Sequence, residues 1–291
     1  EIKMARRKLN ILPKEIRQAR RKKFRRKMFF FFLFFVLIIV GFSVLSNSKI
    51  MRIENIEVSG AEVLNSEDIK NFVKEEMNSK FLYVFSKQNY IFFPMNKVES
   101  EIMKEFPRIG EVRGGKTNSS TVSFSVVERE EEYLWCGSSA VFGADLANVE
   151  CYFVDSTGFI FAKAPLFSGS IYFRFFSSIE NEPLGSYVFN IEEFKKLVYF
   201  IDLVDGIGLD STTLTLEGAP DVEKNYVIYF KKEYEGRSLP PKVIFKTDFD
   251  PEKIANNLEA LFSLQEFLTK FESESGIEYI DLRFDGKVYY K

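Results

Sequence analysis

The stretch TVSFSVVER, Thr121 to Arg129, decides the fold of this protein. Its apolar residues Val122, Phe124 and Val126 alternate with serines, which is the pattern of a half-buried strand. Shortly before it stands GEVRGGKT, Gly110 to Thr117, which matches the G-x-x-x-x-G-K-[ST] pattern of nucleotide-binding P-loops. The two segments give competing predictions, because a P-loop must be followed by a helix.

The residues around GEVRGGKT argue against a phosphate-binding loop. The preceding segment has helical spacing and ends at Pro107, whereas a P-loop follows a buried strand. The run VYFID, Val198 to Asp202, resembles the second nucleotide-binding motif, but it keeps helical spacing with the apolar residues before it. We therefore expect Gly114 and Gly115 to supply positive φ at a hairpin tip, and we expect no nucleotide to bind.

The N-terminal part of the chain is basic and then strongly apolar. Residues 1–28 contain 13 of the 40 Lys and Arg residues and two of the 42 acids, although the whole chain has a net charge of −2. The run MFFFFLFFVLIIVGFSVL, Met28 to Leu45, spans about 27 Å as a helix, close to the roughly 30 Å of a bilayer core. We expect a basic cytoplasmic tail at residues 1–27 and a transmembrane helix at residues 28–46.

Two other interpretations of this apolar run are a buried core helix and a cleaved signal peptide. A core helix would keep one polar face, and a signal peptide would have an apolar region of about 7–15 residues. The positive-inside rule places everything after Leu45 outside the cytoplasm. The basic tail then contacts lipid, so nucleic acid is not an expected partner. The sequence begins with Glu1 and not with Met, which leaves two interpretations: Met4 is the start of translation, or the N-terminus is incomplete.

The residues from Ile53 to Arg129 have the order strand, helix, helix, strand, strand. IENIEVSG predicts the first strand, and NSEDIKNFVKEEM predicts a helix capped by Asn65 or Ser66. A second helix follows Asn96, and the strands IGEV and TVSFSVVER complete the order. This arrangement resembles a POTRA (polypeptide-transport-associated) domain, in which two helices pack on a three-stranded sheet.

The region from Glu130 to Lys291 is richer in predicted strands. Asn190 and Asp250 are the expected caps of helices near residues 191–204 and 251–270. Strands are expected in CYFVDSTGFIF, TTLTLEG, YVIYFKKEY, KVIFK and the closing IEYIDLRFDGKVYYK. The predicted fold class is α+β, with a transmembrane helix, a POTRA domain at residues 50–130, and a mixed β-rich domain with flanking helices at residues 131–291.

Residues suited to catalysis or metal binding are few. The sequence has no histidine, which excludes Ser-His-Asp and Cys-His catalysis and histidine-ligated metals. The acidic run Glu130 to Glu132 is typical of a solvated surface, and no EF-hand spacing is present. We therefore expect no enzymatic activity, no cofactor and no metal.

The two cysteines, Cys136 and Cys151, lie in neighbouring predicted strands. In an oxidising exterior they can form one disulfide, worth about 2–3 kcal/mol. A pair of buried free thiols is the alternative, and the sequence does not choose between the two.

Several motifs, taken in order, resemble the FtsQ/DivIB family of bacterial cell-division proteins. They begin with the basic tail, the apolar helix, and IENIEVSG followed by SEDI. Next come Phe106-Pro107, then Arg113, then VSFSVVER with its final Glu128-Arg129. DSTGFIF is similar to the family's D-x-x-G-x-x-F hairpin, and EYIDLRF to its closing Y-V/I-D-L-R-Y. The resemblance covers residues 28–291, although GGKT stands where the family often has a basic-x-Pro turn.

The resemblance implies a non-enzymatic division scaffold in the plasma membrane at the septum, which links early and late division proteins. It also implies FtsB/DivIC-like and FtsL-like partners, bound in part when a partner strand joins the sheet. The partner-binding residues carried onto this chain are Tyr279, Ile280, Asp281, Leu282, Arg283, Phe284, Tyr289 and Tyr290. The resemblance makes Tyr279 to Phe284 the candidate strand that accepts the partner and Lys287 to Tyr290 its hairpin mate. Ordinary sheet packing or edge shielding is the alternative role for the aromatic side chains. Arg283 has three candidate ion-pair partners: an acid of the partner protein, Asp281 and Asp285.

Two further functions are compatible with parts of the sequence. A POTRA-type protein-translocation or envelope-assembly factor would continue into alternating segments of about ten residues, which the predicted C-terminal helices oppose. A membrane-anchored cell-wall enzyme would need a nucleophile or a pair of acids in a cleft, and no such set stands out in the sequence.

Overall fold

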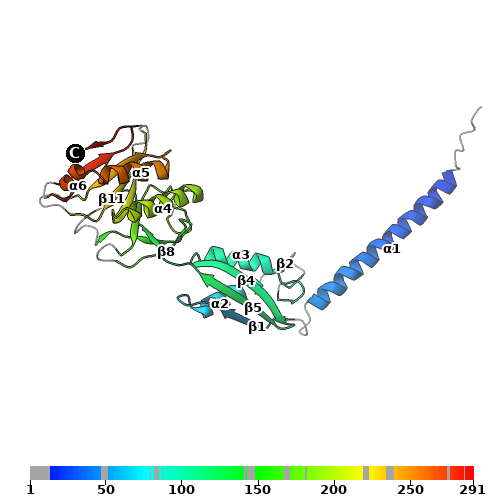
Figure 1. Ribbon diagram of the computed structural model, residues 1–291. Helices are drawn as coiled ribbons and strands as arrows, with labels where there is room; N and C mark the ends of the chain where they lie inside the picture. The colour runs from blue at the N-terminus through cyan, green and yellow to red at the C-terminus, as the bar shows by residue number, and fades with distance from the viewer. Residues whose placement is uncertain are drawn as a thin grey trace, which may run out of the picture. The chain divides into compact units, whose positions relative to one another are not determined.

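The computed structural model shows an α+β protein (Figure 1). It describes residues 14–46, 52–78, 80–81, 85–86, 88–140, 142, 148–166, 171–180, 182–218, 223–233, 239–273, 276–284 and 286–291. The chain divides into two compact units. Unit 1 is drawn from residues 1–59, 65–99 and 113–125, and unit 2 from residues 60–64, 100–112 and 126–291.

Helix α1, Lys14–Ser46, joins the basic and the apolar sequence in one continuous element. Its apolar side chains from Phe29 to Val40 are largely exposed. In the part of the chain that the structure describes, no helix is both long and apolar enough to cross a membrane. This finding overturns the transmembrane helix predicted at residues 28–46, and with it the single-pass plasma-membrane and septal localisation.

A three-stranded sheet with the order β1-β5-β4 follows α1. Its strands are β1, Asn55–Ser59, β4, Ile109–Asn118, and β5, Thr121–Glu128. β1 runs parallel to β5, with Asn55 opposite Thr121. Val122, Phe124 and Val126 of β5 are buried, as their alternation with serines predicts.

Two helices and a short hairpin connect β1 to β4. They are α2, Ser66–Asn78, the paired strands β2, Lys80–Phe81, and β3, Phe85–Ser86, and α3, Met95–Glu105. The side chain of Asn65 accepts a hydrogen bond from the backbone N–H of Glu67 at 3.1 Å, as an N-terminal cap does. The buried residues of α2 are Ile69, Val73 and Met77, spaced four apart along one face of the helix.

The GEVRGGKT segment lies inside strand β4. Gly114 and Gly115 do not have positive φ, so the prediction that they turn a hairpin tip is wrong. A side chain at Gly114 would collide with the Met95 side chain of α3, and the Gly114 N–H donates to Glu99 Oε1 at 2.6 Å. The glycine therefore allows α3 to pack closely on the strand, and a larger residue would force the Met95 and Glu99 side chains to move. The segment continues into β5, where a P-loop needs a helix.

Unit 2 is built on a mixed nine-stranded sheet with the order β14-β13-β12-β11-β10-β9-β6-β7-β8. In chain order the strands are β6, Tyr133–Trp135, β7, Tyr152–Val154, β8, Ile160–Lys163, β9, Phe173–Phe176, β10, Ser211–Glu217, β11, Asn225–Phe230, β12, Lys242–Lys246, β13, Tyr279–Asp281, and β14, Tyr289–Tyr290. The pairs β6–β9, β9–β10 and β12–β13 are parallel, and the other neighbours are antiparallel.

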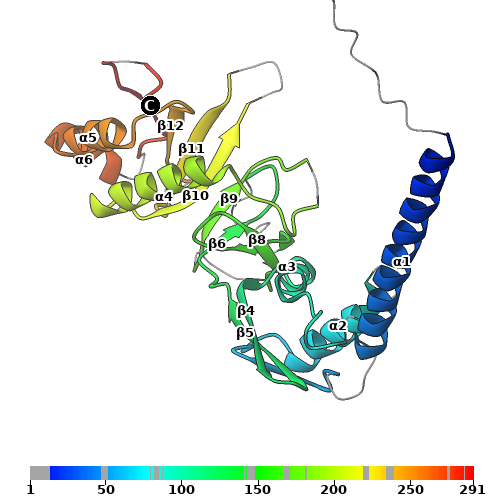
Figure 2. The same ribbon diagram turned by 90° about the vertical axis from the view of Figure 1, so that its right-hand side faces the viewer.

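Helices form two of the crossovers that the parallel pairs require. Helix α4, Ile191–Gly206, connects β9 to β10, while α5, Pro251–Phe262, and α6, Gln265–Glu272, connect β12 to β13. The predicted caps are confirmed: Asn190 Oδ1 accepts from the Glu193 N–H at 2.9 Å, and Asp250 Oδ1 accepts from the Lys253 N–H at 3.1 Å. Helices α4 and α5 lie against each other and pack on the same core (Figure 2).

The helix predicted over residues 251–270 is interrupted. Ser263 ends α5, and Leu264 has an extended backbone and a side chain that is 57% exposed. The interruption turns α6 so that Phe267 and Phe271 pack edge-on against Phe262, with ring centroids 5.0 and 4.9 Å apart. The prediction of one continuous helix near residues 251–270 is therefore wrong.

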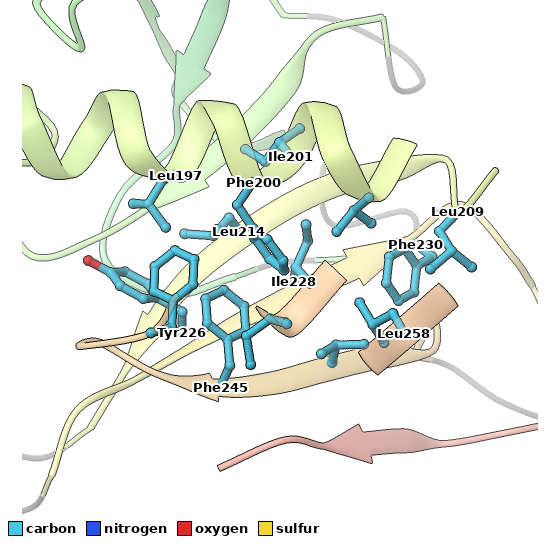
Figure 3. Close-up of a cluster of buried hydrophobic side chains, with 14 of the residues drawn as sticks. Leu197, Phe200, Ile201, Leu209, Leu214, Tyr226, Ile228, Phe230, Phe245 and Leu258 are labelled. Carbon is cyan, nitrogen blue, oxygen red and sulfur yellow. The ribbon is translucent and has the colours of Figure 1, made fainter. Parts of the chain in front are cut away.

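The main core of unit 2 lies between the sheet and these helices. Figure 3 shows Leu197, Phe200 and Ile201 of α4 above side chains of the sheet. A second, smaller core contains Phe176, whereas its neighbour Phe175 belongs to the main core. Since successive residues of a strand point to opposite faces, the two cores lie on opposite sides of the sheet.

Candidate functional site

The two ends of the nine-stranded sheet are β8 and β14. A strand at the end of a sheet presents unpaired main-chain N–H and C=O groups, which can bind a strand of another chain. Proteins protect such ends with covering segments, bulges or charged residues. The two ends of this sheet differ in how well they are protected.

The β8 end is covered by a segment of its own chain. The Ile160 N–H donates to the Ser186 carbonyl, and the Gly185 N–H donates to the Ile160 carbonyl, both at 2.9 Å. The Val188 N–H adds a hydrogen bond to the Gly158 carbonyl at 2.9 Å. The pairing of β7 with β8 also shifts register after Phe153, as a bulge does. These features make the β8 end a poor site for another strand.

The β14 end is open. Tyr290 lies opposite Ile280 and Tyr289 opposite Asp281 in the antiparallel pair with β13. The Lys291 N–H donates to the Tyr279 carbonyl at 3.2 Å, so the Lys291 main chain faces β13. Because successive residues of a strand direct these groups to opposite sides, the Tyr290 N–H and C=O face away from the sheet. Within the described ranges, no strand pairs with this outer side of β14.

The eight residues carried over from the family resemblance meet at this end of the sheet, but their positions differ. Tyr279, Ile280 and Asp281 form β13, which lies between β12 and β14 and therefore has no open side. Leu282 is buried beside them. Of the described strands that these residues form, only β14 has an open side, so the hairpin mate of the candidate strand Tyr279 to Phe284 is the edge.

Three aromatic side chains are exposed around β14. The exposed fractions of Phe284, Tyr289 and Tyr290 are 52%, 48% and 41%. The rings of Phe284 and Tyr289 pack edge-on with centroids 5.4 Å apart. The Tyr290 ring packs edge-on against Phe267 of α6 at 5.0 Å. Aromatic side chains of this kind dominate the binding energy of protein interfaces.

Arg283 pairs with Asp281. Its Nε and Nη2 atoms donate to the two carboxylate oxygens of Asp281 at 2.9 and 2.6 Å, and its main-chain N–H donates to Oδ1 at 3.1 Å. Asp285, the other candidate within this chain, lies outside the described residues. Burial raises the pKa of the Asp281 carboxyl, but the hydrogen bonds from Arg283 outweigh burial and hold that pKa below its ordinary value. The pair fixes the turn that presents Phe284.

The Asp281 carboxylate is expected to stabilise the protein only while it is charged. Its pKa is lower in the folded state, so this contribution is complete above the unfolded pKa of about 3.9 and is lost as the pH falls through the folded pKa. We expect Asp281→Asn to lower the free energy of unfolding by about 1 kcal/mol at pH 7 and by less at pH 3. Urea unfolding followed by the fluorescence of Trp135, the single tryptophan, measures this. An equal loss at both pH values would contradict it, and Asp202→Asn at an exposed position of α4 is the control.

The sequence prediction missed Phe267 and Lys270 of α6, both of which contact Tyr290. The sequence indicates their role only weakly, because the spacing of apolar residues in this region also fits one long helix. In that single helix Leu264 and Leu268 would face the core. Only the interruption after Phe262 turns α6 toward β14.

The cysteines belong to the smaller core. A disulfide joins Cys136 and Cys151, and both residues are buried among the side chains of that cluster. The alternative of two free thiols is therefore set aside. For metals, the described part of the chain contains no group of three or more His, Cys, Asp or Glu side chains that could hold an ion.

Comparison with known protein families finds no family that matches this chain, and comparison with curated proteins finds no matching sequence.

Proposed function

We propose that this protein is a non-enzymatic scaffold and that β14 of unit 2 accepts a strand from a partner protein. The observation that carries the proposal is the difference between the two sheet ends, because β8 is covered by residues 185–188 and β14 is open. The resemblance to FtsQ/DivIB supports a role in cell division, in which the scaffold links early and late division proteins and the partners are FtsB/DivIC-like and FtsL-like.

A strand that joins β14 would gain affinity from two sources. Main-chain hydrogen bonds to Tyr290 give binding that does not depend on sequence, and side chains on the two faces give specificity. Since β14 has only two residues, the main chain provides few bonds. Phe284, Tyr289 and Tyr290 would therefore supply much of the buried area.

Tyr290→Pro tests the open edge directly. Proline removes the outward N–H, and a strand edge tolerates it because that N–H faces solvent. We expect the change to weaken binding of a purified FtsB-type protein from the same organism about tenfold, the effect of losing roughly 1.4 kcal/mol. Titration calorimetry with the full chain measures the affinity.

Two further variants sharpen the result. Tyr290→Phe keeps the main chain and the ring, and it should bind nearly as well as the wild type. Phe284→Glu places a charge among the exposed rings and should weaken binding as well. Unchanged affinity in Tyr290→Pro would remove β14 from the interface and overturn the proposal.

A further inference from the structure

We infer that Lys270 is a specificity-determining residue of the β14 edge and selects a partner strand with acidic side chains on the face toward α6. This inference rests on the proposed docking of a strand at β14. It concerns the chemistry of the partner, which the open main chain alone does not define.

Helix α6 holds Lys270 beside the edge strand. The Lys270 Nζ atom lies 5.1 Å from the centroid of the Tyr290 ring, within the range of a cation–π contact. The same ring packs on Phe267, which is only 2% exposed and is fixed by contacts with Phe262 and Phe271. Because Phe267 anchors α6 in the core, the ammonium group one turn further along has a defined position next to β14.

The pairing register separates the two faces of the edge. Tyr290 lies opposite Ile280, which is part of the core beneath the helices, so Tyr290 is on the helix-covered face. Tyr289 lies opposite Asp281 on the other face, where its ring contacts Phe284. An added strand would place its side chains alternately on these faces. Those beside Tyr290 would meet Lys270, and those beside Tyr289 would meet an apolar aromatic surface.

The charges around the edge favour an acidic partner. Lys291 is neutralised by Glu278 at 3.2 Å, but no described acidic side chain forms an ion pair with Lys270 or Lys287. Lys270 and Lys287 therefore place two positive charges near the edge, although residues 29–291 as a whole contain more acids than bases. Opposite charges on adjacent strands stabilise pairing and like charges oppose it. A partner strand with acidic side chains toward Lys270 and apolar side chains toward Phe284 would complement both faces of the β14 edge.

Two labelled peptides test this inference on the full chain. The first is acetyl-Thr-Val-Glu-Val-Glu-Val-Thr-amide, and the second has lysine in place of both glutamates. We expect the wild type to bind the glutamate peptide about three- to tenfold more tightly than the lysine peptide, as measured by fluorescence anisotropy at low salt. The preference should shrink as salt is raised, because exposed charges are screened.

Variants of Lys270 identify the responsible residue. Lys270→Glu should reverse the preference, Lys270→Met should remove most of it, and Lys270→Arg should keep it. Lys195→Glu makes the same change of charge at an exposed position of α4 and should leave the preference intact. The fluorescence of Trp135 verifies that each variant is folded.

The outcomes separate this inference from the proposed function. If both peptides bind the wild type equally, or if the preference survives in Lys270→Glu, the role of Lys270 is overturned. Docking at β14 would still stand in that case, provided that Tyr290→Pro weakens both peptides. If neither peptide binds, or if Tyr290→Pro has no effect on either, both proposals are overturned.

Discussion

Replacing Phe200 by alanine is expected to lower the free energy of unfolding of unit 2 by about 3–5 kcal/mol. Phe200 is fully buried on α4, and its ring packs edge-on against Phe245 with centroids 4.8 Å apart (Figure 3). It also packs edge-on against Phe249, with centroids 5.2 Å apart. Alanine removes the ring and leaves a cavity between the helix and the sheet. The surrounding aromatic side chains are held by other contacts, so they can fill that cavity only in part.

Urea unfolding followed by Trp135 fluorescence measures this loss, because Trp135 lies in β6 of the same sheet. The adjacent residue provides a matched control. Tyr199 is 47% exposed, and Tyr199→Ala removes a similar ring from the outside of the same helix turn. We expect this control to cost about 1 kcal/mol or less. Equal losses in the two variants would contradict the packing of α4 on the sheet.

Removing the disulfide is expected to cost about 3 kcal/mol. Cys136 and Cys151 are 15 residues apart, and a bond that closes a loop of this length restricts the unfolded chain by about that amount. The double variant Cys136→Ala/Cys151→Ala should therefore unfold at a lower urea concentration. The smaller core loses two of its members at the same time, which adds to the effect.

The reduced wild type is the control for this second prediction. Dithiothreitol should shift the wild-type transition toward that of the double variant, and it should not change the double variant itself. A thiol titration under denaturing conditions verifies that reduction is complete. If fully reduced wild type kept its original midpoint, the disulfide would contribute nothing to stability.

The two predictions differ in their expected effect on the docking edge. Phe245 belongs to β12, which pairs with β13, and β13 in turn pairs with β14. The core around Phe200 therefore supports the strands that position the open edge. In contrast, the disulfide ties down the opposite part of the sheet, near β6 and β7. Of the two changes, we therefore expect the loss of core packing in Phe200→Ala to disturb the open edge at β14.

Local patterns predicted the elements whose signals lie within a few residues. Asn190 and Asp250 cap their helices because a short polar side chain reaches an N–H three residues away, whatever the remainder of the chain does. The segment TVSFSVVER forms a strand because its apolar residues alternate with serines, and this two-residue repeat places the apolar side chains on one face of a strand. These interactions need no distant partner, so the sequence was sufficient.

Predictions that depended on distant neighbours were less successful. Gly114 resembled a turn glycine, yet its role comes from Met95 and Glu99 on a helix that packs against it. The candidate strand Tyr279 to Phe284 has edge-like residues, but its place between β12 and β14 depends on the order of the whole sheet. The transmembrane helix was predicted from the apolar run at residues 28–46, but no helix in the described part of the chain is both long and apolar enough to cross a membrane.

The sequence by itself determined the helix caps, the alternating strands, the absence of histidine chemistry and the clustering of aromatic residues near residue 290. Only the tertiary structure decided which sheet end is open. It also decided that α6 places Lys270 beside Tyr290. A second long-range contact is made by Glu128, whose carboxylate accepts hydrogen bonds from the main-chain N–H groups of residues 62–64 at 2.8 to 3.0 Å. The reason is physical: caps and alternation are set by neighbours along the chain, whereas an edge is defined by what packs beside it.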